Sequence, residues 1–195
     1  MLRQLVVSCL LAFAFAGTTE AASLRPLQLA QIIDDAALAF QGTCVDNRTE
    51  REAATGFVVT YTTFAVKEVL KGTVPATHTI KQIGGKMPGG EASYRVDGVP
   101  SFEPGREYVV LLAGVSSAGF SSPLGLAQGQ FTVQKAVSGD KVGNGRDFRE
   151  MTADTSIALP ATAAAKALGG NAAPLRSLGL EDFKQMVRAH AGRAR

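Results

Sequence analysis

The sequence YTTFAVKEVLKG, residues 61–72, is the most regular stretch of this chain and the best indicator of its fold. Polar and apolar residues alternate through its first half, as in a strand with one side toward a core. The pattern extends over Phe57–Leu70, which is over twice the length of a usual strand of about five or six residues. The apolar face changes after Val66, which predicts a β-bulge near Lys67–Glu68. A long strand with apolar residues on both faces is typical of a small barrel, where a bend changes the face that points inward.

Further strand-like segments lie on both sides of this stretch. We predict strands near 38–45, in THTIKQI (77–83), in REYVVLLAG (106–114) and in GLAQGQFTVQKAV (125–137). Gly and Pro clusters separate them, as expected for strands joined by turns. The predicted fold class is therefore mainly β.

Helical periodicity marks both ends of this β region. A short N-terminal helix is predicted from apolar residues at helical spacing, namely Leu29, Ile32, Ile33 and Ala36. A C-terminal amphipathic helix in LEDFKQMVRAH (180–190) has an apolar face formed by Leu180, Phe183, Met186 and Val187. Gly192 is expected to end this helix. Residues 151–177 are rich in Ala, Thr, Gly and Pro, and predict a loose connector.

The N-terminus has the layout of a secretory signal peptide over residues 1–22. Arg3 precedes an apolar run from Leu5 to Ala16, and small residues follow. We therefore expect a periplasmic or secreted protein with its mature N-terminus between Gly17 and Ser23. We expect no integral membrane segment after signal removal. The expected organisation is a barrel domain over 23–150, the connector, and a C-terminal helix and tail over 178–195.

One cysteine remains after signal removal, because Cys9 lies within the apolar run and Cys44 does not. A mature chain with a single cysteine has no internal disulfide and must be stabilised by packing. Alternation places Cys44 on the same face as Leu38, Phe40 and Gly42, and a small buried hydrophobe is the favoured interpretation. A thiol that pairs between chains or reacts is the alternative.

The middle of the chain resembles a known family of domains. A leading helix, AFQGTCV, a long strand ending in VKEVLKG, a glycine-rich loop and FEPGREYVVLL follow in that order. The order is similar to the OB-type barrel of netrin-like domains, which include the tissue inhibitors of metalloproteinases. It also resembles exported bacterial proteins that are sometimes associated with matrixin-type metalloproteases. The resemblance covers about residues 28–135, on Gly42, Tyr61, Phe64, Val66, Val69, Leu70, Lys71, Gly72, Gly84, Gly85, Phe102, Pro104, Gly105, Tyr108, Gly125, Gln128, Gly129 and Phe131.

The resemblance implies an OB-like (netrin/TIMP-like) barrel and an exported partner, possibly a peptidase, rather than a chemistry. The inhibitors bind the protease zinc through a cysteine at the mature N-terminus. This chain has no cysteine near Ala22 or Ser23, so the resemblance does not imply inhibition by that route.

Motifs for catalysis, metals and cofactors are absent from the sequence. The histidines, His78 and His190, belong to no H-E-x-x-H pair, and both are interpreted as surface residues. No G-x-S-x-G elbow is present. The net charge of +3 is modest, and no strand face combines lysines with several aromatic residues. We therefore expect no cofactor, no metal, no nucleic-acid partner and no enzyme activity, with a Cys44–His78 thiol pair as a minor alternative.

The loop GGKMPGGEASYRVDGVP, residues 84–100, is the candidate binding segment. A phosphate-loop interpretation fails because Lys86 is followed by Met87 rather than Ser or Thr. The loop is either a flexible connection or a binding loop on a rigid scaffold. Met87, Tyr94 and Arg95 are of residue types enriched at protein interfaces. Because a small barrel is filled by its own side chains, we expect a protein-like interface rather than a deep pocket.

The sequence thus favours an exported, non-catalytic binding or accessory module whose partner is another exported protein. The first alternative is a regulator or inhibitor of an exported peptidase. The second is a thiol-dependent enzyme that uses Cys44.

Overall fold

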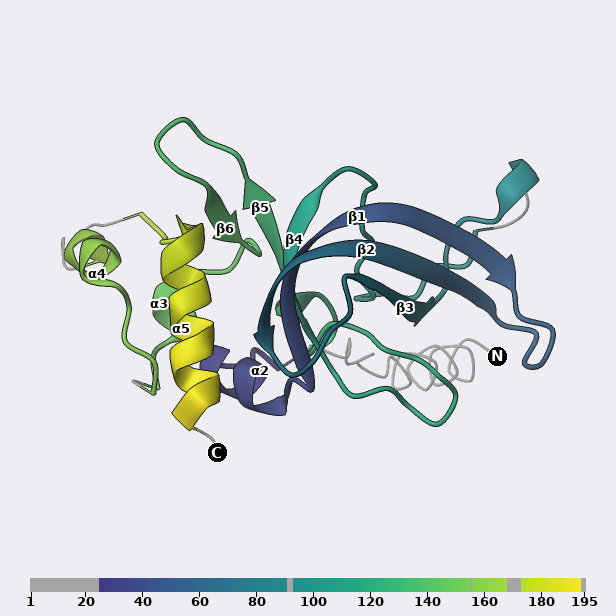
Figure 1. The fold of residues 1–195 in the computed structure, drawn as a ribbon, viewed down its shortest axis with the longest axis horizontal. Helices are drawn as coiled ribbons and strands as arrows, with labels where there is room; N and C mark the ends of the chain where they lie inside the picture. The colour runs from purple at the N-terminus through teal and green to yellow at the C-terminus, as the bar shows by residue number, and fades with distance from the viewer. Residues whose placement is uncertain (1–24, 91–92, 155, 168–172, 194–195) are drawn as a thin grey trace, which may run out of the picture.

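The computed structural model describes residues 25–90, 93–154, 156–167 and 173–193 (Figure 1). The expected signal peptide, residues 1–22, lies outside the described residues. The fold is mainly β, with one seven-stranded antiparallel sheet in this part of the chain. Its strands are β1 (Leu38–Arg51), β2 (Val58–Lys71), β3 (Thr77–Ile83), β4 (Glu107–Leu112), β5 (Gln130–Gln134), β6 (Lys141–Gly143) and β7 (Leu178–Gly179). The helices are α2 (Leu29–Asp35), α3 (Phe148–Met151), α4 (Ala161–Ala167) and α5 (Leu180–Arg193), with the 3₁₀ turns η2 (Pro88–Gly90) and η3 (Leu126–Gly129).

The first four strands form a Greek key. The spatial order is β3-β2-β1-β4-β5-β6-β7, so β4 returns beside β1 after the β1–β2–β3 meander. Strand pairing ends at β3 on one side and at β7 on the other. The sheet is therefore open, and strand pairing does not close it into a barrel.

The bulge expected in the long strand is present. Gln41 pairs with Glu68 and the next residue, Gly42, pairs with Val66, so Lys67 is the extra residue on β2. Similar register shifts leave Leu70 of β2 and Val45 of β1 as extra residues. Figure 1 shows β1 and β2 as long, curved neighbours, as expected when bulges increase the local twist.

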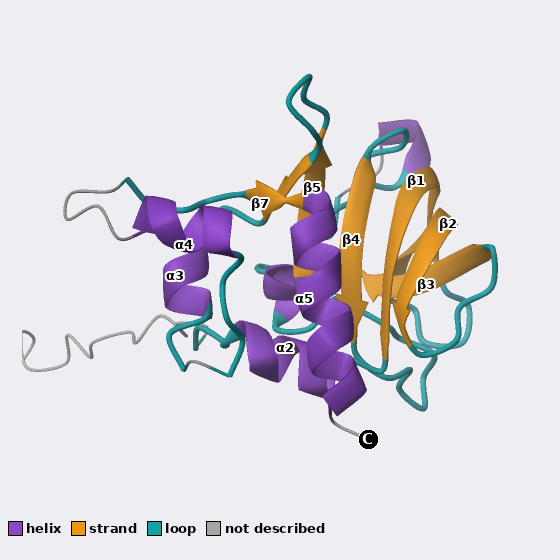
Figure 2. Cartoon of the chain, turned by 60° about the vertical axis from the view of Figure 1, so that its left-hand side comes forward, coloured by secondary structure: helices purple, strands orange, loops and turns teal. Residues whose placement is uncertain are grey.

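Apolar residues gather on both faces of the sheet and form two cores. Figure 2 shows the helices gathered on one side, where α2 and α5 pack with the apolar side chains of β4, β5 and β6. On the opposite face, loop residues such as Phe102 complete a second core with Phe40, Phe64 and Tyr108. Strand β1 supplies both cores, because Ala39 belongs to the first and Phe40 to the second.

The C-terminal helix docks on the sheet through the predicted apolar face. All four residues of that face are buried, and the ring of Phe183 lies 4.6 Å from that of Phe131 and 5.8 Å from that of Phe148. The helix runs through Gly192 and ends at Arg193, so the expected stop at Gly192 is wrong. A glycine in a final turn costs only about 1 kcal/mol relative to Ala, which the helix tolerates.

Two other expectations differ from the structure. In segment 125–137, residues 126–129 form η3 rather than strand, because Gly125 has a left-handed φ of 56° and turns the chain before β5. The segment expected to be a loose connector contains α4, and its residues Ile157 and Ala163 are buried in the first core. Ala163 therefore supplies a small side chain for packing in that core.

The GLAQG segment also holds the start of the described chain. The Gln128 side chain accepts a hydrogen bond from Leu27 N (2.8 Å) and donates one to Arg25 O (3.1 Å). Arg146 donates to both Leu27 O and Gln128 Oε1, each at 2.8 Å. Residues 25–27 are thereby fixed against the fold.

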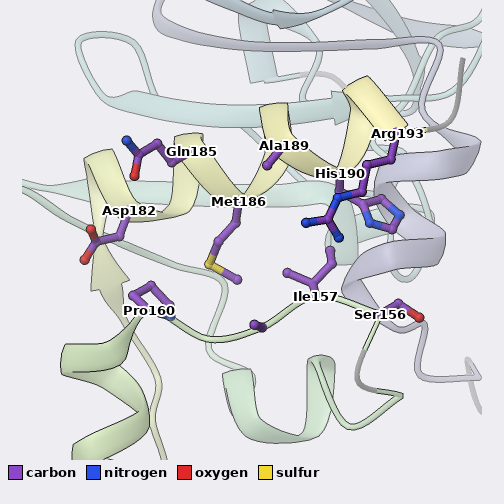
Figure 3. Close-up of a pocket in the computed structure, with 10 residues that line it drawn as sticks. Ser156, Ile157, Pro160, Asp182, Gln185, Met186, Ala189, His190 and Arg193 are labelled. Carbon is purple, nitrogen blue, oxygen red and sulfur yellow. The ribbon is translucent and has the colours of Figure 1, made fainter.

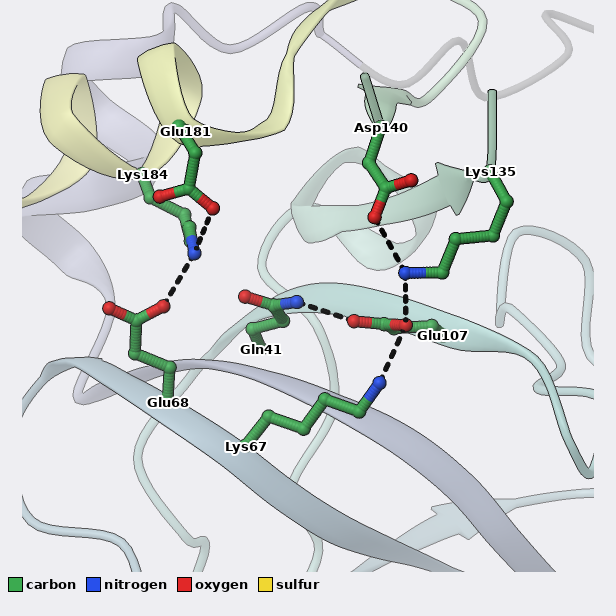
Figure 4. A network of polar contacts seen from close by, with 8 residues as sticks. All are labelled: Gln41, Lys67, Glu68, Glu107, Lys135, Asp140, Glu181 and Lys184. Atoms are coloured by element: carbon green, nitrogen blue, oxygen red, sulfur yellow. Dashed lines mark hydrogen bonds and ion pairs between the residues drawn. The ribbon is translucent and has the colours of Figure 1, made fainter. Parts of the chain in front are cut away.

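Two ion networks lie on the sheet, one with Lys184 of α5 and one around Glu107 of β4 (Figure 4). Lys184 of α5 is buried, and its Nζ lies 2.5 Å from Glu68 Oε2 and 2.6 Å from Glu181 Oε1. Glu107 of β4 accepts hydrogen bonds from Lys67 Nζ (2.8 Å) and the Gln41 amide, and Lys135 Nζ lies 3.0 Å from it. A buried lysine and a buried carboxylate thus each have oppositely charged partners, as burial of a charge requires.

Candidate functional site

The two described ends of the segment 84–100 border a hollow of about 510 Å³, which we call the loop hollow. Strands β1, β2 and β3 form its floor, and the loop and the segment that follows it form its walls. It is lined by Asn47, Thr49, Thr60, Thr62, Gln82, Ile83, Gly84, Gly85, Lys86, Ser93, Tyr94, Arg95, Val96, Val99, Pro100, Ser101 and Phe102.

The floor is made of cross-strand polar pairs. Thr49 pairs with Thr60, which in turn pairs with Gln82 across three adjacent strands. Asn47 pairs with Thr62 one step further along. Alternation along β2 places Thr60 and Thr62 on the same face as Phe64, so the polar floor continues directly from the second core.

Hydrogen bonds among these side chains hold the floor in place. Thr60 Oγ1 donates to Gly84 O at 2.6 Å, so the hydroxyl of Thr49, 3.0 Å away, must donate to Thr60. Thr62 Oγ1 donates to Asn47 Oδ1 at 2.7 Å, and Asn47 Nδ2 donates to Phe102 O at 2.5 Å. The hydroxyl hydrogens of all three threonines are therefore used within the floor.

Glycine is required where the loop leaves β3. Gly85 has a φ of 140°, and a Cβ there would overlap the Thr60 hydroxyl and lie 2.7 Å from Thr49 Cγ2. Gly85 N donates to Tyr94 O at 2.8 Å and Tyr94 N donates to Gly85 O at 3.0 Å. This two-bond bridge closes the neck of the loop and fixes the backbone next to Lys86, on the loop side of the bridge, and next to Arg95, on the β3 side.

Two of the three predicted binding residues line the loop hollow. Tyr94 is 50% exposed and Arg95 is exposed, and both belong to the lining. Met87 is half-buried and is not among the lining residues, so the structure does not bring it together with the other two. The polar floor was not recognised from sequence, although the spacing of Thr60 and Thr62 from Phe64 places all three on one face.

The expectation of little internal room does not hold for this fold. A closed small barrel is filled by its own side chains. Here the sheet is open, and its far end carries short polar residues such as Thr49, Thr60 and Thr62 instead of large apolar ones. Space for a ligand therefore remains between the sheet and the loop.

Cys44 is buried in the second core, as its alternation predicts. Its Sγ lies 3.8 Å from Asp46 O and 3.9 Å from Asn47 Oδ1, both at weak hydrogen-bond distance. Burial raises the pKa of the Cys44 thiol, which disfavours the reactive thiolate. His78 contacts the ring of Phe40 edge-on at 5.6 Å, and burial lowers its pKa.

His190 is largely buried rather than on the surface, with only 14% of its side chain exposed. Its Nε2 lies 3.0 Å from Asp34 Oδ1, so it links α5 to the end of α2. His190 and Met186 line a second hollow of about 470 Å³ between α5 and residues 156–160 (Figure 3). His190 Nδ1 is buried without a hydrogen-bond partner in the described part of the chain. Because water does not reach this nitrogen, a ligand in the hollow would not reach it either.

Two findings on the described ranges concern metal sites and membrane-spanning helices. These ranges contain no group of three or more His, Cys, Asp or Glu residues placed to hold a metal ion. None of the helices described is both long and apolar enough to cross a membrane. No family model matches the chain, and no curated protein matches it.

Proposed function

We propose that this protein is an exported, non-catalytic binding or accessory module that captures another exported protein at the loop hollow. The observation that carries the proposal is the loop hollow itself, with Tyr94 and Arg95 in its lining. Ligand sites are typically concave spaces of about 300–1,000 Å³ with a few placed polar groups. Loops fixed on a rigid sheet are common binding elements.

The construction of the loop hollow supports binding of a segment of a protein. The Gly85–Tyr94 bridge and the floor hydrogen bonds organise the space before a partner arrives, which lowers the entropy cost of binding. Tyr and Arg are the residue types that most often dominate binding energy at protein interfaces. Burial of Cys44 favours this role over thiol chemistry, because a nucleophilic thiol must be accessible.

The proposal includes the finer fold relationship and the compartment. The strand order β3-β2-β1-β4-β5 is that of a Greek-key sheet, and the OB fold is a five-stranded, partly open Greek-key barrel. An OB-like, netrin-type ancestry is consistent with this order, in a sheet where β3 and β5 do not pair with each other to close a barrel. Export rests on the signal-peptide layout of residues 1–22. An exported peptidase is one candidate partner.

A capture experiment tests the proposal. Tagged wild type and the Tyr94→Ala/Arg95→Ala double variant are incubated with the exported fraction of the source cells, and captured proteins are identified by mass spectrometry. Both side chains are exposed, so we expect the melting temperature to be nearly unchanged and recovery of the specific partner to fall at least about tenfold, as the loss of two central contacts implies.

The matched control removes two exposed side chains elsewhere. Val137 and Lys141 lie on the β5–β6 hairpin, are exposed, and do not line the loop hollow. The Val137→Ala/Lys141→Ala variant should capture the partner as well as wild type. Equal capture by the Tyr94→Ala/Arg95→Ala variant would show that residues 84–100 are only a connection between strands.

A further inference from the structure

We propose that the loop hollow selects an acidic peptide segment, in which an apolar side chain enters the hollow and a neighbouring Asp or Glu contacts Lys86 and Arg95. This inference rests on the proposed function and specifies the chemistry of the partner. It follows from three properties of the lining: its charge, its available hydrogen-bond donors and its apolar surface.

The charge of the lining has one sign. Lys86 and Arg95 line the loop hollow, and none of the described lining residues is acidic. In the described part of the chain, neither cation has an ion-pair partner. The Gly85–Tyr94 bridge fixes the backbone from which both side chains leave. A negatively charged group bound in the loop hollow would therefore have two cations, and no acid, among the described lining residues.

The hydrogen-bond donors that remain available to a ligand also favour an acidic group. Thr49, Thr60 and Thr62 use their hydroxyl hydrogens within the floor. Asn47 and Gln82 each donate one amide N–H to a backbone carbonyl, and the other donors of the lining, such as the hydroxyls of Ser93, Tyr94 and Ser101, are neutral. The charged donors that remain for a ligand are the side chains at the neck, and a carboxylate accepts bonds from Lys and Arg more strongly than a neutral group does.

The apolar residues of the lining favour a peptide with an apolar side chain next to its Asp or Glu. Ile83, Val96 and Val99 are partly exposed apolar residues that line the loop hollow. A side chain such as Val or Leu would remove this surface from water, whereas a ligand with charges at every position would leave it uncovered. A peptide that alternates apolar and acidic residues matches both parts of the lining. An acidic polysaccharide matches the cations alone.

Direct binding of defined probes tests the inference. Three of the probes are fluorescein-labelled decapeptides in which Val alternates with Glu, with Gln or with Lys. The fourth is a labelled oligogalacturonate. Fluorescence anisotropy measures the affinity of each probe. We expect the Val-Glu peptide to bind wild type about tenfold more tightly than the Val-Gln peptide, since two exposed charge contacts are involved. This preference should weaken as salt is added.

Two charge-reversal variants complete the test. Lys86→Glu/Arg95→Glu should lose the preference for Val-Glu and bind the Val-Lys peptide instead. Arg25→Glu/Lys141→Glu changes the net charge equally at exposed positions outside the lining, and should keep the wild-type order of affinities. Circular dichroism confirms that each variant is folded.

The outcomes separate this inference from the proposed function. Equal affinity for Val-Glu and Val-Gln, or tighter binding of the oligogalacturonate, would overturn the acidic-peptide inference. If the partner is then still captured in a Tyr94- and Arg95-dependent manner, the proposed function stands and only the acidic preference is wrong. The inference would be supported if the wild type and the control variant both prefer the Val-Glu peptide and the Lys86→Glu/Arg95→Glu variant does not.

Discussion

Replacement of Glu107 by glutamine should lower the free energy of unfolding at neutral pH, because it removes a buried carboxylate that the fold holds in its ionised form. The Glu107 side chain is only 7% exposed. Burial has the largest single effect on its pKa and raises it, but hydrogen bonds from Lys67, Gln41 and Lys135 together outweigh burial and lower the pKa to about 2 from an ordinary value of 4.5. The folded protein therefore holds this carboxylate in its ionised form more strongly than the unfolded chain does.

The size and sign of the effect follow from proton linkage. A glutamate with a depressed pKa stabilises the fold fully above its unfolded value, near pH 4.5, and this stabilisation is lost as the pH falls to about 2. Each pH unit between the two pKa values corresponds to about 1.4 kcal/mol, so ionised Glu107 contributes up to about 3 kcal/mol to the free energy of unfolding at neutral pH. Glu107→Gln should lose this contribution, and Lys67 would lose its carboxylate partner.

Urea unfolding followed by circular dichroism measures the effect at a series of pH values from 7 to 2. We expect the free energies of unfolding of wild type and Glu107→Gln to differ by up to about 3 kcal/mol at pH 7 and to converge near pH 2. Glu103→Gln is the control, because the Glu103 side chain is 65% exposed in its pair with Arg106 and such pairs contribute about 0–1 kcal/mol. A constant difference between wild type and Glu107→Gln at every pH would refute the assignment of the effect to this carboxylate.

Three further predictions concern packing, thiol chemistry and processing. Phe183→Ala should lower the free energy of unfolding by about 3–5 kcal/mol, because the ring is fully buried between Phe131 and Phe148; an unchanged melting temperature would show that α5 is not docked in solution. The Cys44 thiol should react with a thiol reagent only after denaturant is added, and rapid labelling of the native protein would contradict its burial. N-terminal sequencing of exported material should find a start between residues 17 and 23, and an intact Met1 would exclude signal cleavage.

The strands and helix faces could be predicted because their periodicities are local. Residues 77–83 form β3 as predicted, and the stripe that contains Phe183 docks as its helical spacing requires. The bulge at Lys67 was also visible, since a change of face within one strand needs an extra residue. These features depend on a few neighbours along the chain.

Two features could not be predicted from the spacing of residues along the chain, namely that the sheet is open and that the loop hollow exists. Both depend on pairing between residues that are distant in sequence. Whether a Greek key closes is decided by the contact of β3 with β5, which are far apart in sequence. The floor needs the register that sets Thr49 against Thr60 and Thr60 against Gln82. The turn at Gly125 was missed because its flanking residues, Leu124 and Leu126, have the apolar character of a strand.

Strand β1 contributes side chains to both cores, and it should therefore open less often than the neck of the loop. Ala39 and Phe40 are adjacent on β1, yet they are buried in opposite cores, so β1 cannot leave the sheet without disrupting both. Amide hydrogens in the first half of β1 should therefore exchange with solvent only through global unfolding, whereas those of Gly85 and Tyr94 need only a local opening of the loop neck. A partner bound in the loop hollow should slow exchange at these two amides far more than it slows exchange in β1.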